Sequence, residues 1–142
     1  MRRLIIAVVA LALAALASSA VAAPKVTGSI KIHGPTSIAL GKKYHETVVG
    51  HISNVHRAYF IQMYEQTPAG RPCAKREEKE GKRSSAHGQG GEFIMHKSFR
   101  QVFHYKAASP GKHRFCVYVA RFFNNNLDTH TIARASLKIS YH

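Results

Sequence analysis

Acidic residues and tryptophan are scarce in this chain: its 142 residues include 7 Asp and Glu and no Trp. A glycosidase needs two carboxylates placed on either side of a bond, and so few acids make such a pair hard to assemble. The hydrolase motif Gly-x-Ser-x-Gly and the phosphate-binding motif Gly-x-x-x-x-Gly-Lys-Ser/Thr are absent. Outside the N-terminal segment, no stretch carries the apolar stripe of an amphipathic helix. These absences argue against the common hydrolases and against a helical fold.

Basic residues are abundant, with 21 Lys and Arg and 10 His, and the formal net charge is +14. The length is typical of one domain, and an apolar content of 45% is enough for a core. A charge of this size attracts phosphates, acidic glycans and anionic membranes, whatever fold lies beneath it. We therefore expect the partner to be an anionic polymer or a cell-envelope surface, bound without recognition of a specific nucleic-acid sequence.

The first 22 residues read as a secretory signal peptide. Two arginines precede an unbroken apolar run over 4–17, and small residues lead to a cleavage site after Ala22. The run is shorter than the roughly 20 residues of a transmembrane helix, and an uncleaved anchor is the alternative. We expect residues 1–22 to be removed, which leaves no transmembrane span. Residues 23–142 then form one secreted, periplasmic or cell-surface domain, with 19 basic against 7 acidic residues and a net charge of +12.

The chain has two cysteines, Cys73 and Cys116, 43 positions apart. In a small exported domain such a pair predicts a disulfide, worth about 4 kcal/mol in the chain-entropy model, and a metal ligand or a nucleophile is the alternative. Neither CxxC, His-x-His nor His-Glu-x-x-His occurs. We therefore predict no metal site and no cofactor. The alternative is a metal site assembled from distant histidines such as His96, His104 and His113.

The periodicity of residues 26–142 indicates strands. Apolar and polar residues alternate over 131–141, and a second strand follows the turn Ser-Pro-Gly at 109–111; we expect these two to pair as a hairpin. Four further strands are predicted over Val26–Ile32, Ser37–Leu40, Tyr44–Ser53 and Arg57–Gln66. A last strand, longer than the others or bulged, is predicted from a row of apolar and aromatic residues at odd-numbered positions: Phe93, Met95, Phe99, Phe103 and Tyr105. About seven short strands predict an all-β sandwich.

The chain enters one strand through Gly-Lys-Lys-Tyr at 41–44, has Gly50 within that strand, and carries Pro-Gly-Lys-His-Arg-Phe-Cys at 110–116. The order of these short motifs resembles that of exported bacterial immunoglobulin-like domains. The likeness covers most of residues 26–142 and implies an antiparallel Ig-like β-sandwich, but no particular reaction. His113 stands where a Tyr is usual in such domains, and the Cys-Trp-Cys core of antibody domains is absent.

A long hydrophilic segment over 67–91 separates the predicted strands. Its mixed charges and glycines predict a charged loop, with at most a short helix over Lys75–Glu80. If Phe115 and Val117 face the core, Cys116 faces outward, and the disulfide holds the loop over that outer face. The candidate polyanion contacts are cations of the loop and of this face, with one tyrosine for stacking: Lys75, Arg76, Lys79, Lys82, Arg83, Arg114, Tyr118, Arg134 and Lys138. The alternative for each is an ordinary solvated residue.

Together these features predict an exported, non-enzymatic binding module with a basic surface. One alternative is a small basic phosphodiesterase or nuclease, in which His serves as acid and base and Lys or Arg holds the phosphate. A further alternative is a His-based metal-binding protein.

Overall fold

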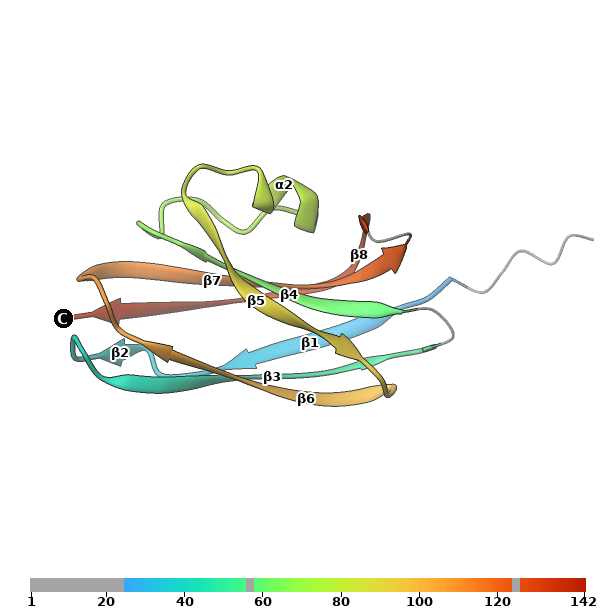
Figure 1. Ribbon diagram of the computed structural model, residues 1–142, viewed down its shortest axis with the longest axis horizontal. Helices are drawn as coiled ribbons and strands as arrows, with labels where there is room; N and C mark the ends of the chain where they lie inside the picture. The colour runs from blue at the N-terminus through green and yellow to red at the C-terminus, as the bar shows by residue number, and fades with distance from the viewer. Residues whose placement is uncertain (1–24, 56–57, 124–125) are drawn as a thin grey trace, which may run out of the picture.

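The computed structural model describes residues 25–55, 58–123 and 126–142, so the predicted signal peptide lies outside the described residues. Within these residues the chain forms eight strands and one short helix, arranged as two facing sheets (Figure 1). The described helix is too short to cross a membrane. The predicted all-β sandwich is confirmed.

One sheet has three antiparallel strands in the order β1-β3-β6. Its strands are β1 (Gly28–His33), β3 (Lys43–Ile52) and β6 (Ser98–Lys106). The other sheet has five strands in the order β2-β8-β7-β4-β5, and its short strand β2 runs parallel to β8. Its strands are β2 (Ser37–Ile38), β4 (Tyr59–Gln66), β5 (Ala86–Ile94), β7 (Gly111–Phe123) and β8 (Asn126–Tyr141). The helix α2 (Glu77–Gly81) lies between β4 and β5 in the chain.

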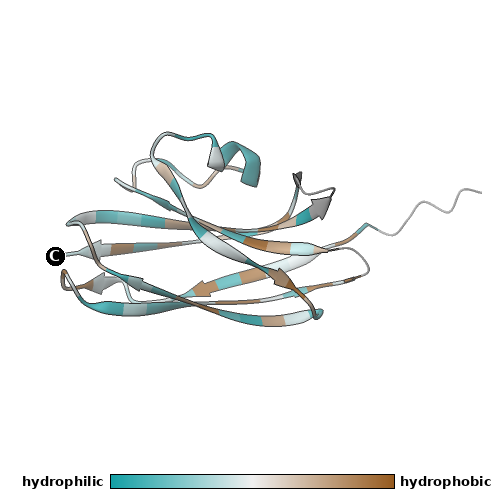
Figure 2. Ribbon diagram, in the orientation of Figure 1, coloured by the Kyte–Doolittle hydropathy of each residue, from teal (hydrophilic) through white to brown (hydrophobic). Residues whose placement is uncertain are grey.

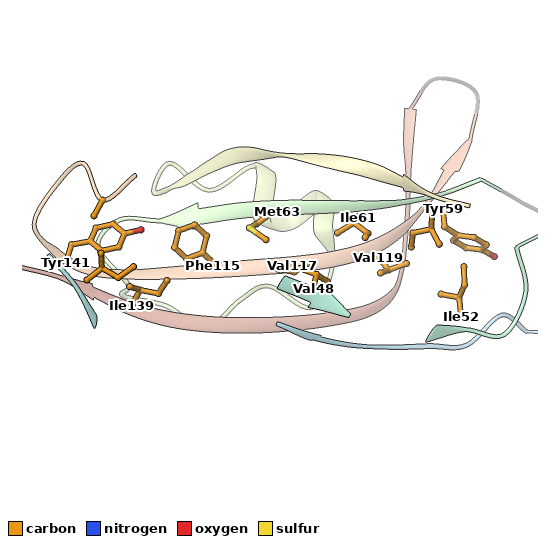
Figure 3. Packing of buried hydrophobic residues seen from close by; sticks show 13 residues of the cluster. Val48, Ile52, Tyr59, Ile61, Met63, Phe115, Val117, Val119, Ile139 and Tyr141 are labelled. Atoms are coloured by element: carbon orange, nitrogen blue, oxygen red, sulfur yellow. The ribbon is translucent and has the colours of Figure 1, made fainter. Parts of the chain in front are cut away.

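The core lies between the two sheets and is built by alternate residues of the long strands, because successive side chains of a strand point to opposite faces. Phe115 and Val117 of β7 face inward as predicted and are fully buried. They pack with a row of residues from β3, β4 and β8 (Figure 3). Figure 2 shows hydrophobic (brown) and hydrophilic (teal) residues following one another along the strands. Burial of each large side chain contributes about 1.5–3 kcal/mol.

The predicted C-terminal hairpin is present. Strands β7 and β8 pair antiparallel, with Gly111 opposite Tyr141 and Phe115 opposite Leu137. The backbone of Gly111 has a φ of +124°, a conformation that favours glycine, so this residue starts β7 directly after the proline of the turn.

The single long strand predicted to contain Phe93 and Phe99 is wrong. Strand β5 ends at Ile94, and β6 begins at Ser98 in the other sheet. Phe93 is therefore half exposed, whereas Phe99 packs against the core. The spacing of these apolar residues at odd positions did not reveal that the chain crosses between the sheets at 95–97.

The predicted charged loop over 67–91 is also too long. Strand β5 begins at Ala86 and pairs with β4, so the last residues of the predicted loop, 86–91, belong to a sheet. The short helix expected over 75–80 is found over 77–81. The connection that remains between β4 and β5 lies over the outer face of the five-stranded sheet (Figure 1).

Candidate functional site

A disulfide fixes this connection to the sheet. Cys73 and Cys116 are bonded as predicted, with their Cα atoms 5.6 Å apart. Cys116 is fully buried on the outer side of β7, opposite to the core-facing Phe115. We call residues 71–85 the covering segment, because they bury this part of the outer face. The five-stranded sheet is thus buried on both sides at β7.

Glu80 is the centre of the contacts beneath the covering segment, and its side chain is fully buried. Its Oε2 accepts hydrogen bonds from the backbone N–H of Ala74 at 2.6 Å and from the phenol of Tyr118 at 2.9 Å. Its Oε1 accepts from Nε2 of Gln66 at 2.6 Å, and Nη1 of Arg83 lies 3.1 Å from Oε2. A buried carboxylate is tolerated only when it is paired and hydrogen-bonded in this way. Glu80 therefore joins the covering segment to the sheet.

Two of the predicted polyanion contacts are buried by the same segment, so their predicted surface role is wrong. Tyr118, which we expected to stack on a ligand, has no exposed surface, and burial raises the pKa of its phenol above the usual value. Arg114 is only 7% exposed, and its guanidinium donates to the carbonyl oxygen of Arg71. The alternation of side chains along β7 correctly placed both residues on the outer face of the sheet. It did not show that the covering segment buries them.

Two exposed predicted cations, Arg134 and Lys138, nevertheless line one groove of about 360 Å³ beside the disulfide, and the buried Arg114 forms part of its wall. The lining contains no carboxylate. Nη1 of Arg134 donates to the carbonyl oxygens of Cys73 and Ala74, each at 3.0 Å. Because a guanidinium has five N–H donors, these two contacts leave other donors of Arg134 for an anion in the groove.

The cations of the covering segment lie apart from this groove. Lys75 and Arg76 line a different hollow of about 270 Å³ together with His130. Lys82 and Arg83 instead form ion pairs with acidic residues of α2. The nine predicted contacts therefore do not form one surface.

A second basic surface, which the sequence analysis missed, lies on the outer face of the three-stranded sheet. The register of β1, β3 and β6 brings alternate residues of the three strands together on this face. Eight of these residues are basic and exposed: Lys31, His33, Lys43, His45, His51, Arg100, His104 and Lys106. We call these eight residues the basic sheet face. Its signal in the sequence is the recurrence of basic residues at positions i and i+2, as in Lys31/His33 and His104/Lys106.

Two histidines of the basic sheet face are neighbours across the strands. His45 lies opposite His104, and their ring centroids are 6.2 Å apart. His51 lies next to Ser98, with 3.1 Å between Nδ1 and Oγ. A hollow of about 480 Å³ beside His45 is also lined by two other basic residues, His33 and Lys43.

Glu46, the one acidic residue in these three strands, points away from the basic sheet face. It is fully buried, and within the described residues neither of its carboxylate oxygens has a hydrogen-bond partner. Burial, with a smaller contribution from the charge of Glu65, raises the pKa of Glu46 to about 8. The side chain is therefore mostly protonated at neutral pH and does not offset the positive charge of the sheet.

The three histidines considered for a metal site, His96, His104 and His113, are not brought together. His113 is buried, with Nδ1 2.7 Å from Oε1 of Glu65 and Nε2 3.0 Å from the carbonyl oxygen of Ser109. His104 lies on the outer face of the other sheet, and His96 lies between β5 and β6. Across the described ranges, no three His, Cys, Asp or Glu side chains are grouped so that they would hold a metal ion.

Comparison with known proteins shows a likeness in fold alone. No protein-family model and no curated protein matches the sequence. A crystal structure of the CARDB domain of the PF1109 protein from Pyrococcus furiosus, in complex with di-metal ions, is similar with a TM-score of 0.50 and 12% identity, over 83% of this chain and 93% of that chain. A β-glucosidase from Listeria innocua has a TM-score of 0.53 and 13% identity, over 82% of this chain but only 16% of the enzyme. These likenesses support an Ig-like β-sandwich and carry no activity over to this chain.

Proposed function

We propose that this protein is an exported, non-enzymatic binding module that binds anionic polymers through its exposed cations. The main support is that most of its acidic residues are buried or paired, whereas many of its basic residues are exposed. Five of the seven acids are buried or paired: Glu46, Glu65, Glu77, Glu78 and Glu80. The cations of the groove and of the basic sheet face have no such acidic neighbours among the residues that line them.

This placement favours a polymer over a small ligand. The groove beside the disulfide belongs to the five-stranded sheet, and the basic sheet face belongs to the other layer. Many weak charge contacts spread over open surfaces suit a long polyanion, whose bound counterions are released on binding.

Export is supported by the leader-like sequence over 1–22 and by the disulfide, since such bonds persist mainly in oxidising compartments. Polysaccharides, nucleic acids and anionic surfaces are all accessible there. The fold itself favours no reaction, because β-sandwich domains of this kind carry many unrelated functions.

Chromatography on immobilised heparin tests the proposal, with an uncharged dextran matrix as the control. We expect the purified exported protein to be retained on heparin at low ionic strength, to elute as salt rises and to pass through dextran. Incubation with heparin, RNA or DNA should yield no cleavage products. Failure to bind heparin at low salt, or turnover of any of these polymers, would contradict the proposed function.

A further inference from the structure

We infer that the basic sheet face is a binding surface for an anionic polysaccharide, which it holds more tightly as the pH falls. This inference rests on the proposed function and adds to it the surface, the class of ligand and the regulation.

The face presents its charges in cross-strand rows. Lys43 lies opposite Lys106 at one end of the sheet, and Val49 is paired with Lys31 on one side and Arg100 on the other. Neighbouring strands are about 4.8 Å apart, and residues i and i+2 of one strand are about 6.6 Å apart. The face extends over about 26 Å along β3, so one linear polymer contacts several rows at once.

The covering segment does not lie over this sheet. Figure 1 shows α2 and its flanking segments on the far side of the other sheet, and no described element beneath β1, β3 and β6. The hollow lined by His33, Lys43 and His45 adds a concave place for one sugar residue or its anionic group. An open face with one sign of charge is complementary to a polyanion.

Histidine gains its positive charge between about pH 8 and pH 5, which makes the face responsive to acid. The face has four Lys and Arg and four His, so full protonation doubles its positive charge from four to eight. Two protonated rings such as His45 and His104, 6.2 Å apart, repel each other, and an anion bound between them relieves this repulsion. Protonation and anion binding therefore strengthen each other.

The groups that face these histidines include no carboxylate. His45 faces His104 across the register, with Lys43 and Lys106 in the next row. The neighbours of the other two histidines are neutral or basic: Thr47 and Lys31 beside His33, and Ser29, Ser98 and Val49 beside His51. Glu46 lies beneath the face, but its carboxyl is buried and retains its proton at neutral pH. Acidification thus adds charge that no acid of these strands neutralises.

A polysaccharide fits this face better than a nucleic acid. The outward-facing residues of β1, β3 and β6 include no Phe, Tyr or Trp, and the imidazole rings of the four histidines offer bases a smaller stacking surface than those side chains. A sheet lying flat also presents no helix or ribbon to the major groove of a duplex. Sulfate and carboxylate groups along a glycan need only the cations that are present.

The test measures the affinity of the purified exported protein for a size-defined heparin fragment at pH 7.5 and pH 5.5, at one ionic strength. We expect about tenfold tighter binding at pH 5.5, because each exposed charge contact changes an equilibrium constant by about 1.4- to 5-fold. The variant H45Q/H104Q should lose most of this gain. The control H87Q/H142Q, which removes two exposed histidines elsewhere, should retain it.

A second comparison locates the surface. At pH 7.5, K31Q/R100Q should weaken heparin binding more than K75Q/K79Q, which removes the same charge from the covering segment. If the wild type binds heparin and H45Q/H104Q keeps the full pH response, or K75Q/K79Q has the larger effect, this surface is wrong while the proposed function stands. Tighter binding of an oligothymidylate than of heparin under the same conditions would overturn the ligand class. No heparin binding at either pH would instead contradict the proposed function.

Discussion

The phenol oxygen of Tyr118 lies 2.9 Å from Oε2 of Glu80, and this contact joins β7 to the helix of the covering segment. The same phenol lies 3.0 Å from the carbonyl oxygen of Ala74. Since Tyr118 and Glu80 are both fully buried, the covering segment is held by polar contacts and the disulfide more than by an apolar core of its own. This explains how a hydrophilic segment remains packed on a sheet.

Replacing Tyr118 with Phe should destabilise the protein by about 1–3 kcal/mol, because Glu80 loses a donor while it stays buried. Urea unfolding measures this loss. In a double-mutant cycle with Glu80→Gln, the coupling between the two substitutions should be about 0.5–3 kcal/mol. Additive effects would mean that the hydrogen bond contributes little to the attachment of the covering segment.

Removal of the disulfide should cost more. The variant C73S/C116S loses a crosslink between residues 43 positions apart, and the expected loss is about 2–5 kcal/mol of unfolding free energy. Proteolysis should then cut the covering segment first, since the attachment at residue 73 is lost. The wild type should show no titratable thiol when denatured without reductant. Two free thiols in freshly purified protein would contradict the bond.

Glu46 makes the stability depend on pH. The folded state holds this proton up to about pH 8, whereas the unfolded chain releases it near 4.5. Between these values the native state binds the extra proton, so the contribution of Glu46 to the unfolding free energy falls as pH rises, by up to about 1.4 kcal/mol per pH unit. The stability of Glu46→Gln relative to wild type should therefore increase from pH 5 to pH 8.

The exposed Glu92 provides the matched control for this prediction. Glu92→Gln removes the same charge from the chain but should show a stability difference from wild type that changes little with pH. The free-energy cost of burying an amide at position 46 is the same at every pH. The measured quantity is therefore the change with pH in the stability difference between Glu46→Gln and wild type. A flat difference for Glu46→Gln over this range would mean that the carboxyl is ionised in the fold.

The alternation of apolar and polar residues in the sequence correctly predicted those strands that have one face in the core along their whole length. Residues 131–141 and the inward row of Phe115 and Val117 are examples, because a period of two follows directly from strand geometry. The pattern did not separate Phe93 from Phe99, because odd-numbered apolar residues on two successive strands give the same alternation as on one long strand. It also gave no information on the burial of Tyr118, which depends on contacts with a segment 38 residues away.

The candidate site was predicted less well than the fold. The sequence placed Arg134 and Lys138 on one outer face, and the structure brings them to one groove. The basic sheet face depends on cross-strand register, as in the pairing of His45 with His104 over 59 positions of sequence, which no local pattern contains. Spacing at i and i+2 shows only that two residues share a face of one strand.

The salt dependence of heparin affinity tests most directly whether exposed cations of this protein bind anionic polymers. Titrations of the purified wild-type protein at several salt concentrations give the slope of log K against log salt. We expect a clearly negative slope that becomes steeper at pH 5.5 than at pH 7.5, as more contacts release counterions. An affinity that does not change with salt at either pH would contradict the account.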